Sequence, residues 1–145
     1  MKKLSLLFLL LFALSNTHAQ PKHAAAVKPP AYLIGTFEDD YQIRYEINDT
    51  LWLQLPSSRY HIIKWNFAEK YLIARNDGRN PGEGGLYTRI DYMEFSNMAP
   101  WKWGFCLTAY KAESDKAAEA TAAADRDHPM KGCNSFPFSR MKRVR

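Results

Sequence analysis

The sequence predicts a mainly β protein: a small antiparallel β-barrel or curved meander of about seven or eight strands, with one Ala-rich helix near the C-terminus. Three observations predict this class. Short apolar or alternating segments follow one another, separated by Pro, Asn, Asp and Gly residues that favour turns. The chain carries 8 Phe, 8 Tyr and 4 Trp, a density that suits a small barrel filled by rings. Only one stretch has the composition of a helix.

The first 19 residues have the parts of a secretory signal peptide. Lys2 and Lys3 make a positive start, residues 4–14 are almost all apolar, and small or polar residues lead to Ala19. The apolar run of about 11 residues is too short to span a bilayer as a helix, which needs roughly 20. We therefore predict a signal peptide over residues 1–19. The mature protein is then periplasmic or secreted and has no integral membrane segment.

The remaining chain is predicted as one linker and one domain. Residues 20–31 contain Pro, Ala and Lys without periodicity, which is typical of a flexible linker. Residues 32–145 have the length of a single β-barrel-like domain. The predicted strands of the meander cover residues 32–37, 41–47, 51–55, 60–65, 70–75, 86–95 and 101–110.

Two of these segments show how side chains alternate across a sheet. In residues 41–47, Tyr and Ile occupy every second position, with Gln, Arg and Glu between them, as in a half-buried strand. In residues 101–110, Trp101, Trp103 and Phe105 share one face. The chain finishes with residues 135–144, which we predict as a final edge strand because proline cannot donate to a ladder.

The helix is predicted over residues 114–127. This stretch is Ala-rich, and Ala is the best helix former. Ser114 is placed as an N-cap and Asp115 lies in the first turn, where a negative charge is favourable. Pro129 and Gly132 follow and end the helix.

The charge distribution argues against a nucleic-acid-binding face. Without Lys2 and Lys3, 18 Lys and Arg face 15 Asp and Glu, a net charge of +3. Four of the basic residues close the chain: Arg140, Lys142, Arg143 and Arg145. Without that tail the body is nearly neutral, whereas nucleic-acid binding needs a basic patch that tracks phosphates. We interpret the tail as solvated charge.

The chain has two cysteines, Cys106 and Cys133. In an exported protein, two cysteines most often form a disulfide, which is the interpretation we favour. A reactive thiol is an alternative, but it needs a histidine partner, and His61 and His128 lie in no known cysteine-hydrolase signature. A zinc site is a weaker alternative, because the clustered ligands are missing.

A short motif follows the predicted linker. Gly35-Thr36-Phe37 is similar to the G-x-W signature that opens lipocalin-type barrels, in which the aromatic plugs the closed end and a late arginine stacks on it. Phe37 stands in place of Trp, and Arg140 or Arg89 is the candidate stacking arginine. A plain core aromatic is the alternative for Phe37, and we favour it.

A wider set of motifs covers most of residues 32–141. The chain resembles a group of small exported bacterial proteins with a lipocalin-like barrel, and the resemblance implies that fold and a disulfide but no activity. The matching stretches are residues 60–62, 65–66, 71–77, 85–91, 105–106 and 132–140.

Two functions follow as hypotheses. The first is binding of a small apolar or aromatic ligand in the barrel interior or at its mouth, with loop 76–85 as a lid. Phe37, Trp101, Trp103 and Phe105 are the candidate ligand-facing or core aromatics, and for the two tryptophans we favour the core. The second hypothesis is a protein–protein interaction or inhibitor module of the cell envelope.

An enzyme is the least favoured class. The sequence contains no Ser-His-Asp order and no paired carboxylates in a pattern typical of catalysis. The Gly-rich loop 76–85 lacks the G-K-[ST] of a phosphate-binding loop. We accordingly predict no catalytic residue, no cofactor, no metal and a monomer.

Overall fold

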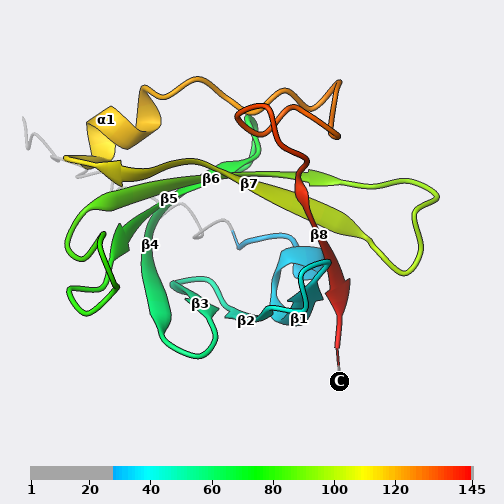
Figure 1. Cartoon of the computed structure of the whole chain (residues 1–145), viewed down its shortest axis with the longest axis horizontal. Helices are drawn as coiled ribbons and strands as arrows, with labels where there is room; N and C mark the ends of the chain where they lie inside the picture. The colour runs from blue at the N-terminus through cyan, green and yellow to red at the C-terminus, as the bar shows by residue number, and fades with distance from the viewer. Residues whose placement is uncertain (1–27, 145) are drawn as a thin grey trace, which may run out of the picture.

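Within residues 28–144, which the computed structural model describes, the chain folds into a closed antiparallel barrel of eight strands with one short α-helix (Figure 1). Each strand pairs with the next, and β8 returns to pair with β1. The predicted fold class is confirmed. In chain order the elements are the 3₁₀ helix η1 (Ala31–Leu33), β1 (Gly35–Asp39), β2 (Arg44–Ile47), β3 (Leu51–Gln54), β4 (Ser58–Asn66), β5 (Tyr71–Asn76), β6 (Tyr87–Glu94), β7 (Trp103–Ala112), α1 (Asp115–Glu119) and β8 (Ser139–Arg143).

The predicted signal peptide, residues 1–19, lies outside the described residues, as do residues 20–27 of the predicted linker. Residues 28–30 have no regular structure, and η1 begins at Ala31. The first predicted strand, 32–37, is therefore replaced by η1 and the start of β1. Leu33 of η1 is 1% exposed and packs into the barrel core.

Strand β2 begins later than predicted because a buried carboxylate closes the turn before it. Asp39 is 2% exposed and accepts hydrogen bonds from the backbone N–H groups of Tyr41 and Ile43, both at 2.9 Å. Between them Gln42 has φ 68°, which no strand residue adopts. In β2 itself the predicted alternation of buried and exposed residues is confirmed.

Aromatic rings fill the interior of the barrel. The ring centroid of Trp52 lies 5.0 Å from that of Phe105 and 5.9 Å from that of Trp103, and Phe37 meets Trp103 at 5.2 Å. These pairs are edge-to-face, the arrangement in which aromatic quadrupoles attract. Among the described residues, the Tyr92 hydroxyl and Trp103 Nε1 are buried polar atoms without a hydrogen-bond partner.

An arginine covers the end of the barrel where β1 begins. The Arg143 guanidinium lies 4.8 Å from the centroid of the Phe37 ring and donates to the carbonyl oxygens of Ala31 and Ile34 at 3.0 and 2.8 Å. Gly35 makes room for it, since a Cβ there would collide with the guanidinium, and its φ of +133° suits glycine.

The arginine that stacks on Phe37 is therefore Arg143, and the assignment of Arg140 or Arg89 to that place is wrong. The reason is the β1–β8 register, which puts Phe37 opposite Arg143. Arg140 instead lies over Trp101, 5.4 Å from its ring centroid.

The final strand is also different from the prediction. β8 is paired on both sides, with β7 and with β1, so it is not an edge strand. Pro137 precedes the strand, and its missing N–H therefore interrupts no ladder. Arg140 and Lys142 form ion pairs with carboxylates of β1 and of the turn after it. Arg140, Lys142 and Arg143 are thus part of the barrel wall, in place of the solvated charge that the sequence predicted, and Arg145 lies outside the described residues.

The helix is shorter than the predicted span of 114–127. Its N-cap is confirmed, because the Ser114 side chain accepts a backbone N–H of the first turn. However, α1 ends at Glu119. Beyond this point the Ala-rich sequence continues as irregular chain. A tertiary contact caps the helix end: Arg89 Nη1 donates to the carbonyl oxygens of Glu119 and Thr121, at 2.7 and 3.0 Å.

We expect Arg143→Ala to lower the free energy of unfolding by about 1–3 kcal/mol, because it removes a cation–π contact and two hydrogen bonds to carbonyl oxygens. Urea unfolding followed by tryptophan fluorescence measures this change. Arg44→Ala is the matched control, since Arg44 is an exposed arginine with one loose ion pair, at 3.7 Å. Equal losses in the two variants would contradict the role of Arg143.

Candidate functional site

One long connection covers the outer face of the barrel at β5, β6 and β7 (Figure 1). We call residues 113–138 the covering segment. Ala118 of α1 is fully buried against Tyr71 and Ile73, whose side chains point out of the barrel. Ala124 is buried further along, beside the disulfide. These strands therefore have a core on both faces.

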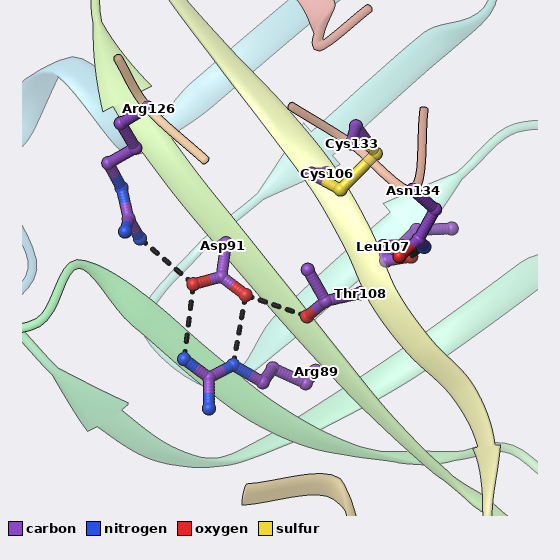
Figure 2. The surroundings of a disulfide bond; sticks show 8 residues. All are labelled: Arg89, Asp91, Cys106, Leu107, Thr108, Arg126, Cys133 and Asn134. Carbon is purple, nitrogen blue, oxygen red and sulfur yellow. Dashed lines mark hydrogen bonds and ion pairs between the residues drawn. A yellow bond between two sulfur atoms is a disulfide. The ribbon is translucent and has the colours of Figure 1, made fainter. Parts of the chain in front are cut away.

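A buried carboxylate holds the centre of this outer layer. Asp91 is 0% exposed, and three side chains surround it in Figure 2. Arg89 donates through Nε to Oδ2 at 2.9 Å and through Nη2 to Oδ1 at 3.2 Å. Thr108 Oγ1 donates to Oδ2 at 2.6 Å, and Arg126 Nη2 donates to Oδ1 at 2.9 Å. Each carboxylate oxygen of Asp91 thus accepts two hydrogen bonds, which compensate the cost of burying the charge.

The two arginines carry this cluster into the covering segment. Arg89 binds the carbonyl oxygens at the end of α1, and its guanidinium lies 4.0 Å from the Tyr71 ring centroid. Arg126 donates to three more backbone carbonyl oxygens at 2.8–3.0 Å, those of Glu69, Lys70 and Tyr92. Because its side chains bind one another and backbone carbonyl oxygens of both the sheet and the covering segment, the cluster anchors the covering segment.

The predicted disulfide is confirmed and lies beside this cluster (Figure 2). Cys106 of β7 and Cys133 of the covering segment are joined, with Cα atoms 5.4 Å apart. Asn134 Nδ2 donates to the carbonyl oxygen of Leu107 at 3.3 Å. Cys133 and Phe136 exchange two backbone hydrogen bonds, at 2.9 and 2.8 Å. The last part of the covering segment is therefore fixed along β7.

Two hollows lie along this fixed wall, one on each side of Tyr41 and Pro137, which line both. The first, the apolar groove, has a volume of about 420 Å³. Its polar residues are Asp40, Tyr41 and Arg140. Its apolar residues are Phe95, Met98, Pro129, Met130, Pro137 and Phe138.

The groove is assembled from three connections of the chain and from β8, which supplies Arg140. Phe95 and Met98 belong to the β6–β7 connection, Met130 and Phe138 belong to the covering segment, and Tyr41 belongs to the β1–β2 turn. Met130 and Tyr41 are 69% and 67% exposed. The groove is thus an apolar surface that is open to solvent and lies outside the barrel.

The second hollow, the barrel mouth, has a volume of about 470 Å³ and reaches the core residues Tyr45 and Phe105. The Tyr45 hydroxyl donates to Asp39 Oδ2 at 2.9 Å. Burial, reinforced by this carboxylate, raises the pKa of Tyr45, so the phenol stays protonated. Nearby, Tyr60 donates to Glu83 at 2.7 Å, and burial likewise raises the pKa of Tyr60.

Loop 76–85 does not have the contacts of a lid. Asn80 is 4% exposed, accepts from the Arg59 N–H and donates to the Arg59 carbonyl oxygen, both at 2.8 Å. Asn76 Nδ2 donates to the carbonyl oxygen of Glu83 across the loop and to the carbonyl oxygen of Tyr110. These bonds hold the loop to β4 and β7, so it is a fixed part of the wall.

The four aromatics singled out in the sequence do not form one site. Phe37 and Trp103 are buried core residues, and Phe105 is a core residue that also reaches the mouth. Trp101 lies outside the barrel before β7, with Arg140 and Lys142 each 5.4 Å from its ring centroid. The core interpretation thus fits Trp103 but not Trp101.

The groove and its rim were not predicted from the sequence. Among the described residues, five large apolar side chains are exposed, and all of them except Ile63 line one or both hollows. These four are Tyr41, Tyr110, Met130 and Phe136. Three of these lie in turns or loops rather than in strands. The available signal was their residue type, because Met and Phe in turn-rich segments are unusual away from a core.

Comparisons of the chain with protein-family models, with curated proteins and with solved structures gave no match. In the described part of the chain, no helix combines the length and the apolar character that crossing a membrane requires. Residues 28–144 also contain no group of three or more His, Cys, Asp or Glu side chains placed to hold a metal ion.

We expect Asp91→Asn to lower the free energy of unfolding by about 3–5 kcal/mol, because it leaves two arginines next to a neutral amide in a buried place. Chemical denaturation measures the loss. Asp127→Asn is the control, since this carboxylate belongs to the same segment and is exposed. A loss in D91N no larger than in D127N would show that the cluster does not anchor the covering segment.

We expect the double variant Cys106→Ala/Cys133→Ala to lose about 2–5 kcal/mol of stability. The bond closes a loop across a sequence separation of 27. Alkylation with mass spectrometry provides the chemical check: no cysteine should react in the oxidised protein, and both should react after reduction and unfolding. Two reactive thiols without reductant would contradict the disulfide.

Proposed function

We propose that the protein is an exported small β-barrel that binds a small apolar or aromatic ligand in the apolar groove beside the barrel mouth. The observation that carries the proposal is the groove itself. It has about 420 Å³ of volume, six apolar lining residues and a rim methionine that is 69% exposed. Ligand pockets in proteins have volumes of about 300–1,000 Å³ and are mostly apolar with a few polar groups.

Because the barrel interior is filled, the groove is the more favourable binding site for this ligand. Trp52, Trp103 and Phe105 pack edge-to-face across the interior, and Trp52 and Trp103 are at most 1% exposed. A ligand there would have to displace rings, whereas the groove is open. Met98 and Met130 suit an external site, because unbranched thioether side chains adapt to the shape of a ligand.

Export is proposed from two independent features. Residues 1–19 have the pattern of a signal peptide. The Cys106–Cys133 disulfide suits an oxidising compartment, the periplasm or the medium. The resemblance to exported lipocalin-like barrels is supported by Gly35 and Phe37 below Arg143, which reproduce the expected pairing of a plug aromatic with a late arginine.

Protein–protein interaction is the second candidate function, and one observation favours it. Tyr41, Tyr110, Met130 and Phe136, which surround the two hollows, are 48–71% exposed. A small ligand inside a hollow would leave much of these side chains in water, whereas a protein surface would cover them.

The neutral fluorescent probe N-phenyl-1-naphthylamine tests ligand binding. We expect saturable binding to the folded wild type, and a dissociation constant raised about tenfold or more in Met98→Glu/Met130→Glu, because charges replace apolar contacts. Ile63→Glu is the matched control, since Ile63 is an exposed apolar residue of β4 that does not line the groove.

Two results would contradict this proposal. The first is a folded wild type that binds no probe, which would leave protein interaction as the function supported by the exposed rim. The second is a double variant that binds as tightly as Ile63→Glu, which would place the probe elsewhere on the molecule.

A further inference from the structure

The groove contains one positively charged side chain, Arg140, and its position is fixed. Its backbone N–H donates to Asp40 Oδ1 at 3.1 Å, and its Nε donates to Asp40 Oδ2 at 2.9 Å. The backbone N–H of Asp40 donates in return to the carbonyl oxygen of Arg140 at 3.1 Å. Three hydrogen bonds therefore fix the position of the arginine at the edge of the groove.

This fixed arginine has unused donors. Each guanidinium carries five N–H groups, and only the one on Nε is used by Asp40. Within the described part of the chain, neither Nη1 nor Nη2 of Arg140 takes part in a hydrogen bond, although Arg140 is only partly exposed, with 38% of its side chain accessible. Four N–H donors thus remain for water or for a ligand.

The side chains that line the groove supply few acceptors for those donors. Asp40 is its one carboxylate, and both oxygens of that group are already bonded to Arg140. The Tyr41 hydroxyl is the remaining polar side chain, and Tyr41 is 67% exposed at the rim. A ligand that reaches Arg140 must therefore bring its own acceptors. The pairing with Asp40 balances the charge, so selectivity comes from directed donors and not from net charge.

The apolar wall next to Arg140 depends on a glycine in the neighbouring strand. Gly104 of β7 pairs directly with Arg140 of β8. A Cβ at Gly104 would come within 2.6 and 2.9 Å of two atoms of the Phe95 ring, so the glycine leaves the space that this ring occupies against the strand. The Phe95 ring and the arginine thus meet at one place in the sheet, an apolar face beside a donor group.

We propose that the ligand of the groove is an apolar carboxylate. Its chain or ring packs against Phe95, Met98 and Met130, and its carboxylate accepts hydrogen bonds from the Nη groups of Arg140. Charge-assisted bonds from a guanidinium to a carboxylate are among the strongest in proteins, and the planar fork matches the two oxygens. This inference rests on the proposed function, because it names the chemical class of the ligand for the same groove.

Three competitors with the same ten-carbon chain and different heads test the inference by displacing N-phenyl-1-naphthylamine from the wild type: decanoate, decanol and decyltrimethylammonium, all below their micelle concentrations. We expect decanoate to displace the probe at a concentration at least tenfold lower than either of the others. Equal displacement by decanoate and decanol would overturn the inference while leaving apolar ligand binding intact. Absence of probe binding would contradict both.

Arg140→Met locates the carboxylate contact, because methionine keeps an apolar stem and removes every donor. We expect the preference for decanoate over decanol to fall to within about twofold. Lys131→Met is the control, since Lys131 is an exposed cation next to Met130, and it should keep the tenfold preference. A preference that survives Arg140→Met would overturn the inference. Should that variant unfold, Arg140→Lys, which keeps the charge but not the fork, should show a reduced preference.

Discussion

The buried charge of Asp91 is the constraint on which the rest of the structure depends. A carboxylate with no exposure to water is unfavourable unless each oxygen is hydrogen-bonded. Arg89 and Thr108 belong to the same sheet as Asp91, but Arg126 belongs to the covering segment and lies 35 positions after Asp91 in the chain. Satisfying Asp91 therefore brings the covering segment back over β5, β6 and β7. Arg89 also links this cluster to the end of α1, because it donates to the carbonyl oxygens of Glu119 and Thr121.

The surface with the two hollows is a consequence of that anchoring. Once Arg126 fixes the covering segment, the disulfide at Cys133 and the Asn134 contact to β7 fix the stretch that follows. This stretch supplies Met130 and Phe138 to the groove, and Phe136 to the mouth. The groove thus lies between the barrel wall and its cover, which differs from a barrel that holds its ligand inside. Here the interior contributes stability, and the exterior offers the open apolar surface.

The fold could be predicted from local sequence patterns, whereas much of the groove could not. Alternation in β2 and turn residues between segments predict the strands, and two cysteines in a chain predicted to be exported predict the Cys106–Cys133 bond. Each prediction depends on neighbouring residues or on a small count. Apart from Arg140 of β8, the residues of the groove come from three connections, and loop residues carry no periodic signal that would indicate their contact in the folded chain. Met98 and Met130 therefore could be recognised as a pair only in the folded chain.

By itself, the sequence determined the mainly β class, the order of the strands, the N-cap at Ser114 and the pairing of the two cysteines. The tertiary structure decided which arginine covers Phe37, where the helix stops and where an apolar surface opens. The physical reason is register and burial. Arg143 lies opposite Phe37 only after β8 closes the barrel on β1, and the carbonyl oxygens at the end of α1 are bound by Arg89, which lies 30 positions before Glu119. Both outcomes depend on partners that are far apart in the chain.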